Sequence, residues 1–157
     1  MSMSRKRLFR VAAAALAGLA LFAGGAMLLG VPSARAVEMT VYKSPWCGCC
    51  EAWIDHLRAN GFTVAVKEQE DLDPVKRAFG VPAAMESCHT AVVEGYVIEG
   101  HVPAADIKRL LAERPQARGL AVPGMPAGAP GMEQGGQRDP YEVILFGGGA
   151  PQLYSRY

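Results

Sequence analysis

The sequence lacks the arrangements that many enzyme classes require. It has three histidines in 157 residues, and neither a hydrolytic triad nor a pair of carboxylates spaced for acid and base catalysis stands out. Gly147-Gly148-Gly149 follows an apolar stretch, but no helix-forming sequence comes after it, so it is not a dinucleotide-binding loop. Residues 37–157 carry 11 Lys and Arg against 15 Asp and Glu and contain no basic cluster. We therefore expect no nucleic-acid partner.

Acidic residues are also missing from the first 36 positions, which carry five basic ones. Basic residues between Arg5 and Arg10 precede an apolar run from Val11 to Val31 and the small-residue ending Ala34-Arg35-Ala36. This pattern predicts a signal peptide over 1–36, cleaved before Val37, and an exported protein that leaves the membrane. The run is long enough to span a bilayer, so an uncleaved anchor stays open. Ser4 to Phe9 resembles an imperfect twin-arginine signal, and the export route also stays open.

The chain from residue 37 alternates between strand and helix patterns. Strands are predicted at 37–42, 62–66, 90–93 and 96–98, the last two joined at Glu94-Gly95. Helices are predicted from Cys50 to a stop at Asn60-Gly61, from an Asp73 N-cap with Pro74 at N1 to Phe79, and from Pro103 to before Pro115. The first two strands should pair in parallel. The order β-α-β-α-β-β-α is the thioredoxin plan, so we predict an α/β, thioredoxin-like domain over 37–115.

A C-terminal extension is predicted over 116–157. The segment from Leu120 to Gly136 is rich in Gly and Pro and shows no periodicity, which predicts a loop or an extended arm. A strand over 141–146 follows, so the arm is anchored at both ends and can lie across the domain. Met125 and Met132 stand in Pro-Gly-Met contexts and would supply thioethers, which are ligands suited to Cu(I).

Cysteine is scarce but clustered. Cys47, Cys49 and Cys50 lie within four residues at a predicted strand-to-helix junction, and Cys88 is the fourth. A helix N-terminus favours thiolates, which can exchange disulfides or bind a soft metal. Cys47 and Cys50 have the C-x-x-C spacing of an oxidoreductase, with Cys47 as nucleophile and Cys50 as resolving thiol. The third thiol, Cys49, would hinder such chemistry but adds a metal ligand, which favours metal.

Other candidates have two interpretations. We expect Cys88 and His89, rather than a cis Pro82, to occupy the turn that faces the cysteine loop. Cys88 would then be a ligand or form a disulfide with Cys47 or Cys50. His89 and His101 are either ligands or turn and capping residues. His56 is expected to be exposed, and Met39 and Met85 are expected to pack in the core.

Four motifs resemble those of the CopG-like copper-resistance proteins, a family formerly described as a domain of unknown function. They are Cys47-Gly48-Cys49-Cys50, Cys88-His89-Thr90, Gly100-His101-Val102-Pro103, and Gly119 to Pro126. The resemblance covers nearly all of the chain after residue 36. It implies a periplasmic thioredoxin-like domain, an extension that helps to bind metal, a cysteine-bridged copper cluster and interconversion of Cu(I) and Cu(II).

The sequence thus leads to a copper-binding protein of copper resistance as the first hypothesis. Its expected ligands for one or several copper ions are Cys47, Cys49, Cys50, Cys88, Met125, Met132, His89 and His101. A thiol–disulfide oxidoreductase and a copper chaperone or storage protein without redox turnover are the alternatives. Zinc fits less well, because methionine is not a usual zinc ligand. We expect a monomer that acts with copper efflux or chaperone proteins.

Overall fold

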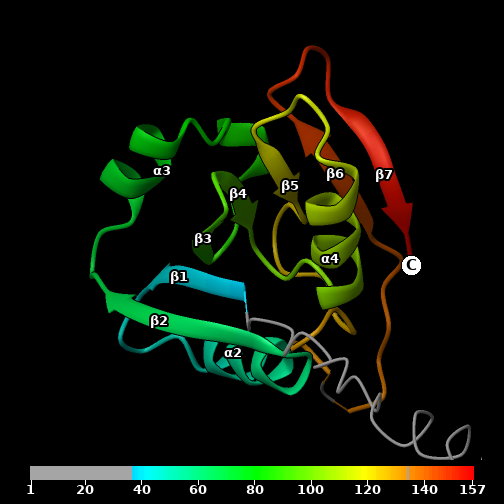
Figure 1. Ribbon diagram of the computed structural model, residues 1–157. Helices are drawn as coiled ribbons and strands as arrows, with labels where there is room; N and C mark the ends of the chain where they lie inside the picture. Colours follow the sequence, from blue (N-terminus) through cyan, green and yellow to red (C-terminus); the bar gives the residue numbers. More distant parts are fainter. Residues whose placement is uncertain (1–36, 134) are drawn as a thin grey trace, which may run out of the picture. The chain divides into compact units, whose positions relative to one another are not determined.

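The computed structural model describes residues 37–133 and 135–157, which form one seven-stranded mixed sheet and three α-helices (Figure 1). The predicted α/β class is confirmed, whereas the predicted signal peptide lies outside the described residues. Across the sheet the strands lie in the order β2 (Phe62–Glu68), β1 (Val37–Lys43), β3 (His89–Val93), β4 (Tyr96–Glu99), β5 (Gly119–Ala121), β6 (Glu142–Phe146) and β7 (Gln152–Arg156). As predicted, β1 and β2 pair in parallel.

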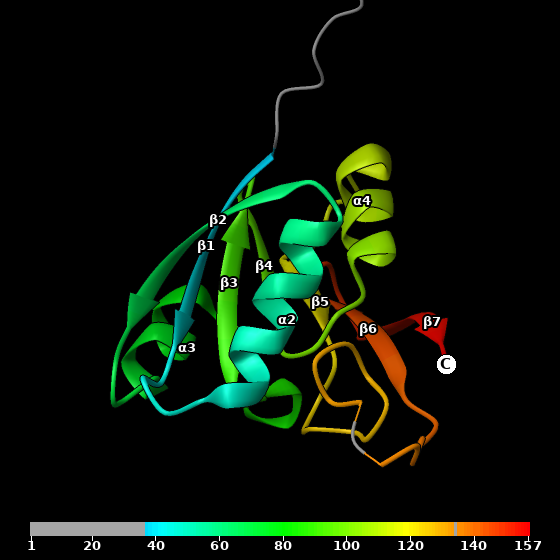
Figure 2. The ribbon, with the colours of Figure 1, turned by 90° about the horizontal axis from the view of Figure 1, so that it is seen from below.

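Helices cover both faces of the sheet. Helices α2 (Gly48–Ala59) and α4 (Ala104–Glu113) lie on one face, and α3 (Asp73–Phe79) lies on the other (Figure 2). The 3.6-residue period turns Trp53, Ile54 and Leu57 of α2 into the main core. Neighbouring strand residues alternate between the faces, so Ile98 joins this core while Val97 joins the smaller cluster behind the sheet. A short 3₁₀ helix, Ala83–Met85, links α3 to β3.

The element order predicted for residues 37–115 is observed, with small differences at the ends. Helix α2 begins at Gly48, before the predicted start at Cys50. The prediction of Asp73 as an N-cap is wrong: Leu72 holds that position, and the backbone N–H of Asp73 donates to a carboxylate oxygen of Asp71. The hairpin at Glu94-Gly95 is confirmed, and φ is positive at both residues, as a tight two-residue turn requires.

The chain after residue 115 continues the same sheet. The arm was predicted from Leu120 onward, but Leu120 and Ala121 belong to β5, which pairs in parallel with β4. The predicted strand over 141–146 is β6. Strand β7 follows it and was missed, because its sequence alternates weakly and both of its faces are largely exposed. The division of the chain at residue 115 stays a prediction.

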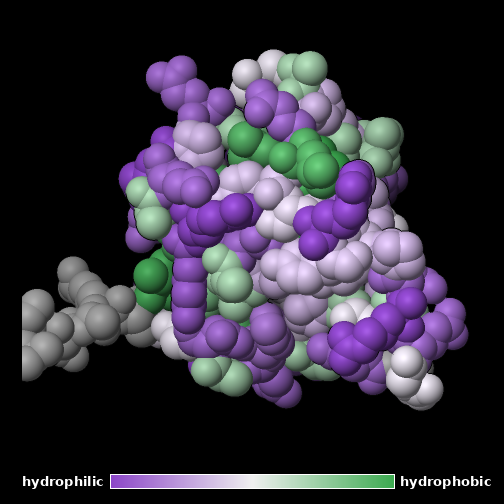
Figure 3. Space-filling model, turned by 90° about the vertical axis from the view of Figure 1, so that its right-hand side faces the viewer, coloured by the Kyte–Doolittle hydropathy of each residue, from purple (hydrophilic) through white to green (hydrophobic). Residues whose placement is uncertain are grey.

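The surface beside β6 and β7 is mainly polar, with small apolar patches (Figure 3). Charged pairs such as Arg156 with Glu142 lie along this edge of the sheet, as is common where a strand has no further partner. In the described ranges, 37–133 and 135–157, no helix is long and apolar enough to cross a membrane.

His56 lies in α2, contacts α4 and is half-buried. The prediction that His56 is exposed is therefore wrong. Its Nε2 accepts a hydrogen bond of 3.1 Å from the backbone N–H of Ala104, in the first turn of α4. Within the part of the chain that the structure describes, neither helix has a hydrogen bond from an N-cap side chain, so this contact supplies one of the missing acceptors for α4. The pKa of His56 is lowered, mainly because the ring is partly buried.

This contact predicts a loss of stability in acid. A pKa lower in the folded than in the unfolded chain means that His56 contributes stability above its unfolded pKa of about 6.5. That contribution disappears as pH falls and the protonated ring stops accepting. Between pH 7.5 and 5, the wild type should lose about 1 kcal/mol more in free energy of unfolding than His56→Gln, which keeps an acceptor without titrating. Urea unfolding measures both profiles, and parallel profiles would contradict the prediction.

Candidate metal centre

Strand register brings four segments of the chain to one end of the sheet. Lys43, the last residue of β1, pairs with His89, the first residue of the antiparallel β3. Thr90 pairs with Glu99 at the end of β4, and Glu99 pairs with Ala121 at the end of β5. The residues that follow β1, β4 and β5 and precede β3 therefore meet. They contain the cysteine loop, Cys88, His101 and the start of the arm.

The first cysteines lie at the N-terminus of α2. Cys47 is the N-cap residue, with extended backbone, and Cys49 and Cys50 lie in the first turn. Free backbone N–H groups and the helix dipole at this position stabilise negative charge on sulfur. Cys47 and Cys50 form a disulfide, while Cys49 and Cys88 are free thiols. The disulfide from Cys88 to Cys47 or Cys50, left open by the sequence, is therefore not formed.

All four sulfurs form one cluster. The Sγ atom of Cys49 lies 3.5 Å from that of Cys47 and 4.0 Å from that of Cys88. The Sγ atom of Cys88 lies 3.5 Å from that of Cys50, whose side chain is fully buried. All four sulfurs fall within 4.8 Å of one another. Cys88 thus lies in the bend that faces the cysteine loop, whereas His89, predicted to share that turn, is the first residue of β3. Pro82 is trans, as expected.

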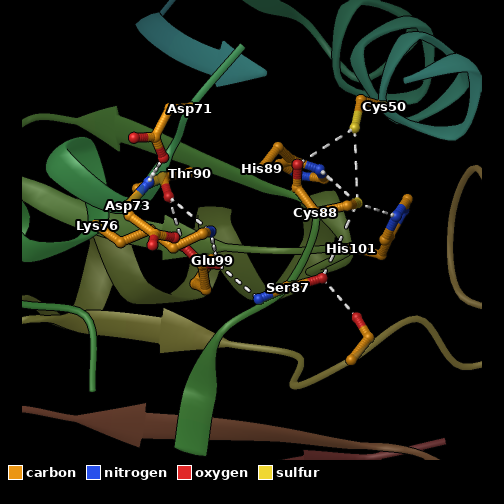
Figure 4. Close-up of polar contacts among 11 residues, drawn as sticks. Cys50, Asp71, Asp73, Lys76, Ser87, Cys88, His89, Thr90, Glu99 and His101 are labelled. Atoms are coloured by element: carbon orange, nitrogen blue, oxygen red, sulfur yellow. Dashed lines mark hydrogen bonds and ion pairs between the residues drawn. The ribbon is translucent and has the colours of Figure 1, made fainter. Parts of the chain in front are cut away.

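A second group of candidate ligand atoms shares Cys88. Nε2 of His101 lies 3.1 Å from the Cys88 sulfur, and Nδ1 of His89 lies 3.4 Å from it (Figure 4). Nδ1 of His101 is 2.8 Å from the carbonyl oxygen of Pro130, which can only accept, so Nδ1 carries the proton. Nε2 is then left with a lone pair directed at Cys88. Both imidazoles are fully buried, and Nε2 of His89 has no hydrogen-bond partner among the described residues.

Burial sets the protonation of this group. Burial is the largest cause of the lowered pKa of His101. Burial also lowers the pKa of His89 strongly, and the nearby His101 and Lys76 lower it further. Both rings are neutral at neutral pH and can act as ligands. Burial also raises the pKa of the Cys88 thiol to about 12, helped by Cys49. A metal ion would displace that proton and bind the thiolate.

The arm lies against this site. Pro130 is buried and holds His101, and the next residue, Gly131, packs on α2. At the other end of the arm, the N–H of Gly124 donates to the carbonyl of Glu86, beside Cys88. Met132 is half-buried, whereas Met125 is 56% exposed. The arm thus lies against the site, while its contribution to metal binding and ligation by the two methionines stay predictions.

Three charged residues behind the site were not predicted from the sequence. Lys43 is fully buried, and its Nζ lies 2.9 Å from a carboxylate oxygen of Glu51 in the first turn of α2. The hydrogen bond to Glu51 is the main cause that raises the pKa of Lys43. Lys76 and Glu99 form a buried ion pair beneath Cys88 and His89. An acidic residue at the end of the apolar stretch Tyr96-Val97-Ile98 was the available signal for Glu99.

Together these features define an α/β protein with a cluster of thiols and imidazoles that could hold a metal ion. A family model described as "Protein of unknown function, DUF411" matches residues 85–132, which include Cys88, His89 and His101. None of the curated proteins matches the chain.

Two solved structures match most of the described chain. They are called "Copper resistance protein copG", Form 2 and Form 1, and both are 46% identical in sequence. Form 2 has a TM-score of 0.75 and Form 1 a TM-score of 0.74, and each match covers 78% of this chain. The matches cover 99% and 98% of the respective structures. The chain therefore belongs to the CopG family of copper-resistance proteins, as the four sequence motifs indicated.

The packing of the arm can be tested at Gly131. Its φ is +84°, and an added Cβ would lie 2.6 Å from the backbone nitrogen of Trp53 and 2.7 Å from the carbonyl oxygen of Cys49. Gly131→Ala should therefore lift the arm from α2 and cost about 1–3 kcal/mol of stability. Limited proteolysis between residues 123 and 139 and thermal unfolding would detect both effects.

Gly124→Ala is the matched control. Gly124 has a similar φ of +70°, but no atom of residues 37–133 or 135–157 lies within 4 Å of an added Cβ. Gly124→Ala therefore introduces the same backbone strain as Gly131→Ala but no steric clash of the added Cβ. Equal proteolysis of the two variants would show that close packing at Gly131 does not hold the arm.

Proposed function

We propose that the chain is an exported, periplasmic copper-binding protein of copper resistance, with copper held by the cysteine cluster. The observation that carries the proposal is the convergence of four sulfurs within 4.8 Å at the N-terminus of one helix. Thiolate sulfur is a soft donor that binds Cu(I) and can bridge two ions, so the cluster has room for more than one copper. The family relationship and the predicted signal peptide support copper resistance and export.

The two overlapping ligand groups suit two oxidation states of copper. With all cysteines reduced, the chain offers four thiolates, a set that favours Cu(I). With Cys47 and Cys50 joined, as in this structure, Cys49, Cys88 and the two neutral imidazoles are left, and imidazole nitrogen also accepts Cu(II). Loss or formation of one disulfide would therefore change the ligand set without moving the fold.

We further propose that the protein interconverts Cu(I) and Cu(II), with Cys47 and Cys50 as its redox pair. Oxidation of the two thiols to the disulfide releases two electrons and two protons. Those electrons reduce two Cu(II) ions to two Cu(I) ions, and the protons leave to solvent. This step leaves Cu(I) beside the disulfide form, whose remaining ligands hold Cu(I) less well than four thiolates would, so the product ions pass to an acceptor. The reverse direction consumes two electrons and two protons. Copper efflux or chaperone proteins would supply and remove the ions.

A thiol–disulfide oxidoreductase is the second candidate, favoured by the Cys47–Cys50 disulfide at a helix N-terminus. In that reaction Cys47 would attack a substrate disulfide and Cys50 would resolve the mixed disulfide. The reaction has no use for Cys49, Cys88 or the two buried imidazoles. A protein that stores or carries copper without redox turnover would use all of them, and it differs from our proposal only in leaving the oxidation state unchanged.

Cysteine variants test copper binding directly. Cys88 belongs to both ligand groups and Cys49 to one. In reduced protein loaded with Cu(I), Cys49→Ser should lower the number of coppers bound per chain and weaken the sulfur-to-copper absorption bands. Cys88→Ser should lower both further. Both variants should keep the far-ultraviolet circular dichroism of the wild type, since the main core does not include these two side chains.

The same titration assigns the thioethers of the arm. Met125→Leu and Met132→Leu conserve volume but remove sulfur, and each should weaken Cu(I) binding if its sulfur is a ligand. Met85→Leu is the matched control, because Met85 packs against the smaller cluster behind the sheet.

Wild-type copper loading in both cysteine variants, together with reduction of insulin by the metal-free protein, would favour the oxidoreductase instead.

A further inference from the structure

A buried ion pair lies behind the second ligand group. Lys76 of α3 and Glu99 at the end of β4 contact each other through Nζ and Oε1, and their side chains are 6% and 0% exposed (Figure 4). Removing two charges from water costs free energy that their attraction often fails to offset. A well-packed apolar pair in their place is often as stable. Stability alone therefore does not account for this pair.

The hydrogen bonds of Glu99 indicate another role. Its Oε1 accepts the backbone N–H of Ser87 at 2.7 Å, and its Oε2 accepts the hydroxyl of Thr90 at 2.6 Å. Nζ of Lys76 also lies 3.3 Å from the Thr90 hydroxyl oxygen. Ser87 and Thr90 are the residues immediately before and after Cys88 and His89. One carboxylate thus fixes both ends of the two-residue segment that carries two ligand atoms.

The same carboxylate is tied to the third ligand through the backbone. Glu99 lies two positions before His101, and Gly100 between them donates its N–H to the carbonyl of His89 at 3.1 Å. Gly100 has a φ of +71°, and an added Cβ would lie 2.5 Å from the Ser87 hydroxyl oxygen and 2.6 Å from the carbonyl oxygen of Val122. The two ligand segments are therefore packed directly against each other where Glu99 holds them.

We propose that the Glu99–Lys76 pair positions Cys88, His89 and His101 so that their ligand atoms converge, and that it thereby sets the copper affinity of the site. Glu99 accepts the hydrogen bonds, and Lys76 neutralises the carboxylate that must be charged to accept them all. Neither side chain touches the ligand atoms, so both are positioning residues. The proposal rests on the proposed copper binding.

The test compares copper affinity with stability in the double variant Lys76→Met/Glu99→Leu. This change keeps approximate volume and removes both charges and every hydrogen bond that they make. Metal-free protein should keep the fold, measured by circular dichroism and thermal unfolding. Competition of the reduced protein against a chromogenic Cu(I) chelator should show binding about tenfold to a hundredfold weaker than in the wild type, the range found when outer partners of metal ligands are lost.

Two further variants keep the result interpretable. Arg114→Gln/Glu94→Gln removes an exposed ion pair between the β3–β4 hairpin and the end of α4 and should leave copper affinity unchanged. Thr90→Val removes one hydroxyl with little change of shape, so it decides the question if the first double variant does not fold. It should weaken Cu(I) binding severalfold.

Wild-type affinity in Thr90→Val and in a folded Lys76→Met/Glu99→Leu would overturn the inference and leave copper binding intact. A wild-type protein that takes up no Cu(I) would instead overturn the proposed function, and the positioning role with it.

Discussion

The pairing of Lys43 with His89 across two antiparallel strands is the constraint on which the site depends. It places the end of β1 beside the start of β3, so that the cysteine loop and Cys88 emerge side by side from the sheet. A shift of one residue would turn the core side chains of β3 to the opposite face. Core packing by Ala91 and Val93 therefore fixes the register that also brings together sulfurs separated by about forty positions.

Two further contacts complete this geometry. The indole N–H of Trp53 in α2 donates to the carbonyl of Val102, which holds the residue after His101 against the helix that carries the cysteines. The Pro130 carbonyl fixes the proton of His101 on Nδ1 and leaves Nε2 free. A helix, a strand connection and the arm thus each fix one part of the proposed ligand set, and the candidate ligand atoms meet in buried surroundings where imidazole stays neutral.

Much of this arrangement was predictable from sequence because it depends on local signals. The apolar period around Trp53 predicted α2, Glu94-Gly95 predicted the hairpin, and the clustered cysteines predicted the site. Strand β5 was not predicted, because it is only three residues long and is stabilised by pairing with β4 and β6 on either side. The roles of His56, Lys43 and Glu99 depend on partners distant in sequence, and a local sequence pattern does not predict which residues those partners are.

X-ray absorption at the copper edge of the reduced, Cu(I)-loaded protein tests the central claim most directly, because it identifies the atoms bound to the metal. Our account predicts a first shell dominated by sulfur, with a copper–copper signal when more than one ion is bound. It also predicts that Cys88→Ser replaces part of that sulfur by lighter atoms. A wild-type spectrum with only nitrogen and oxygen neighbours would contradict copper binding by the cysteine cluster.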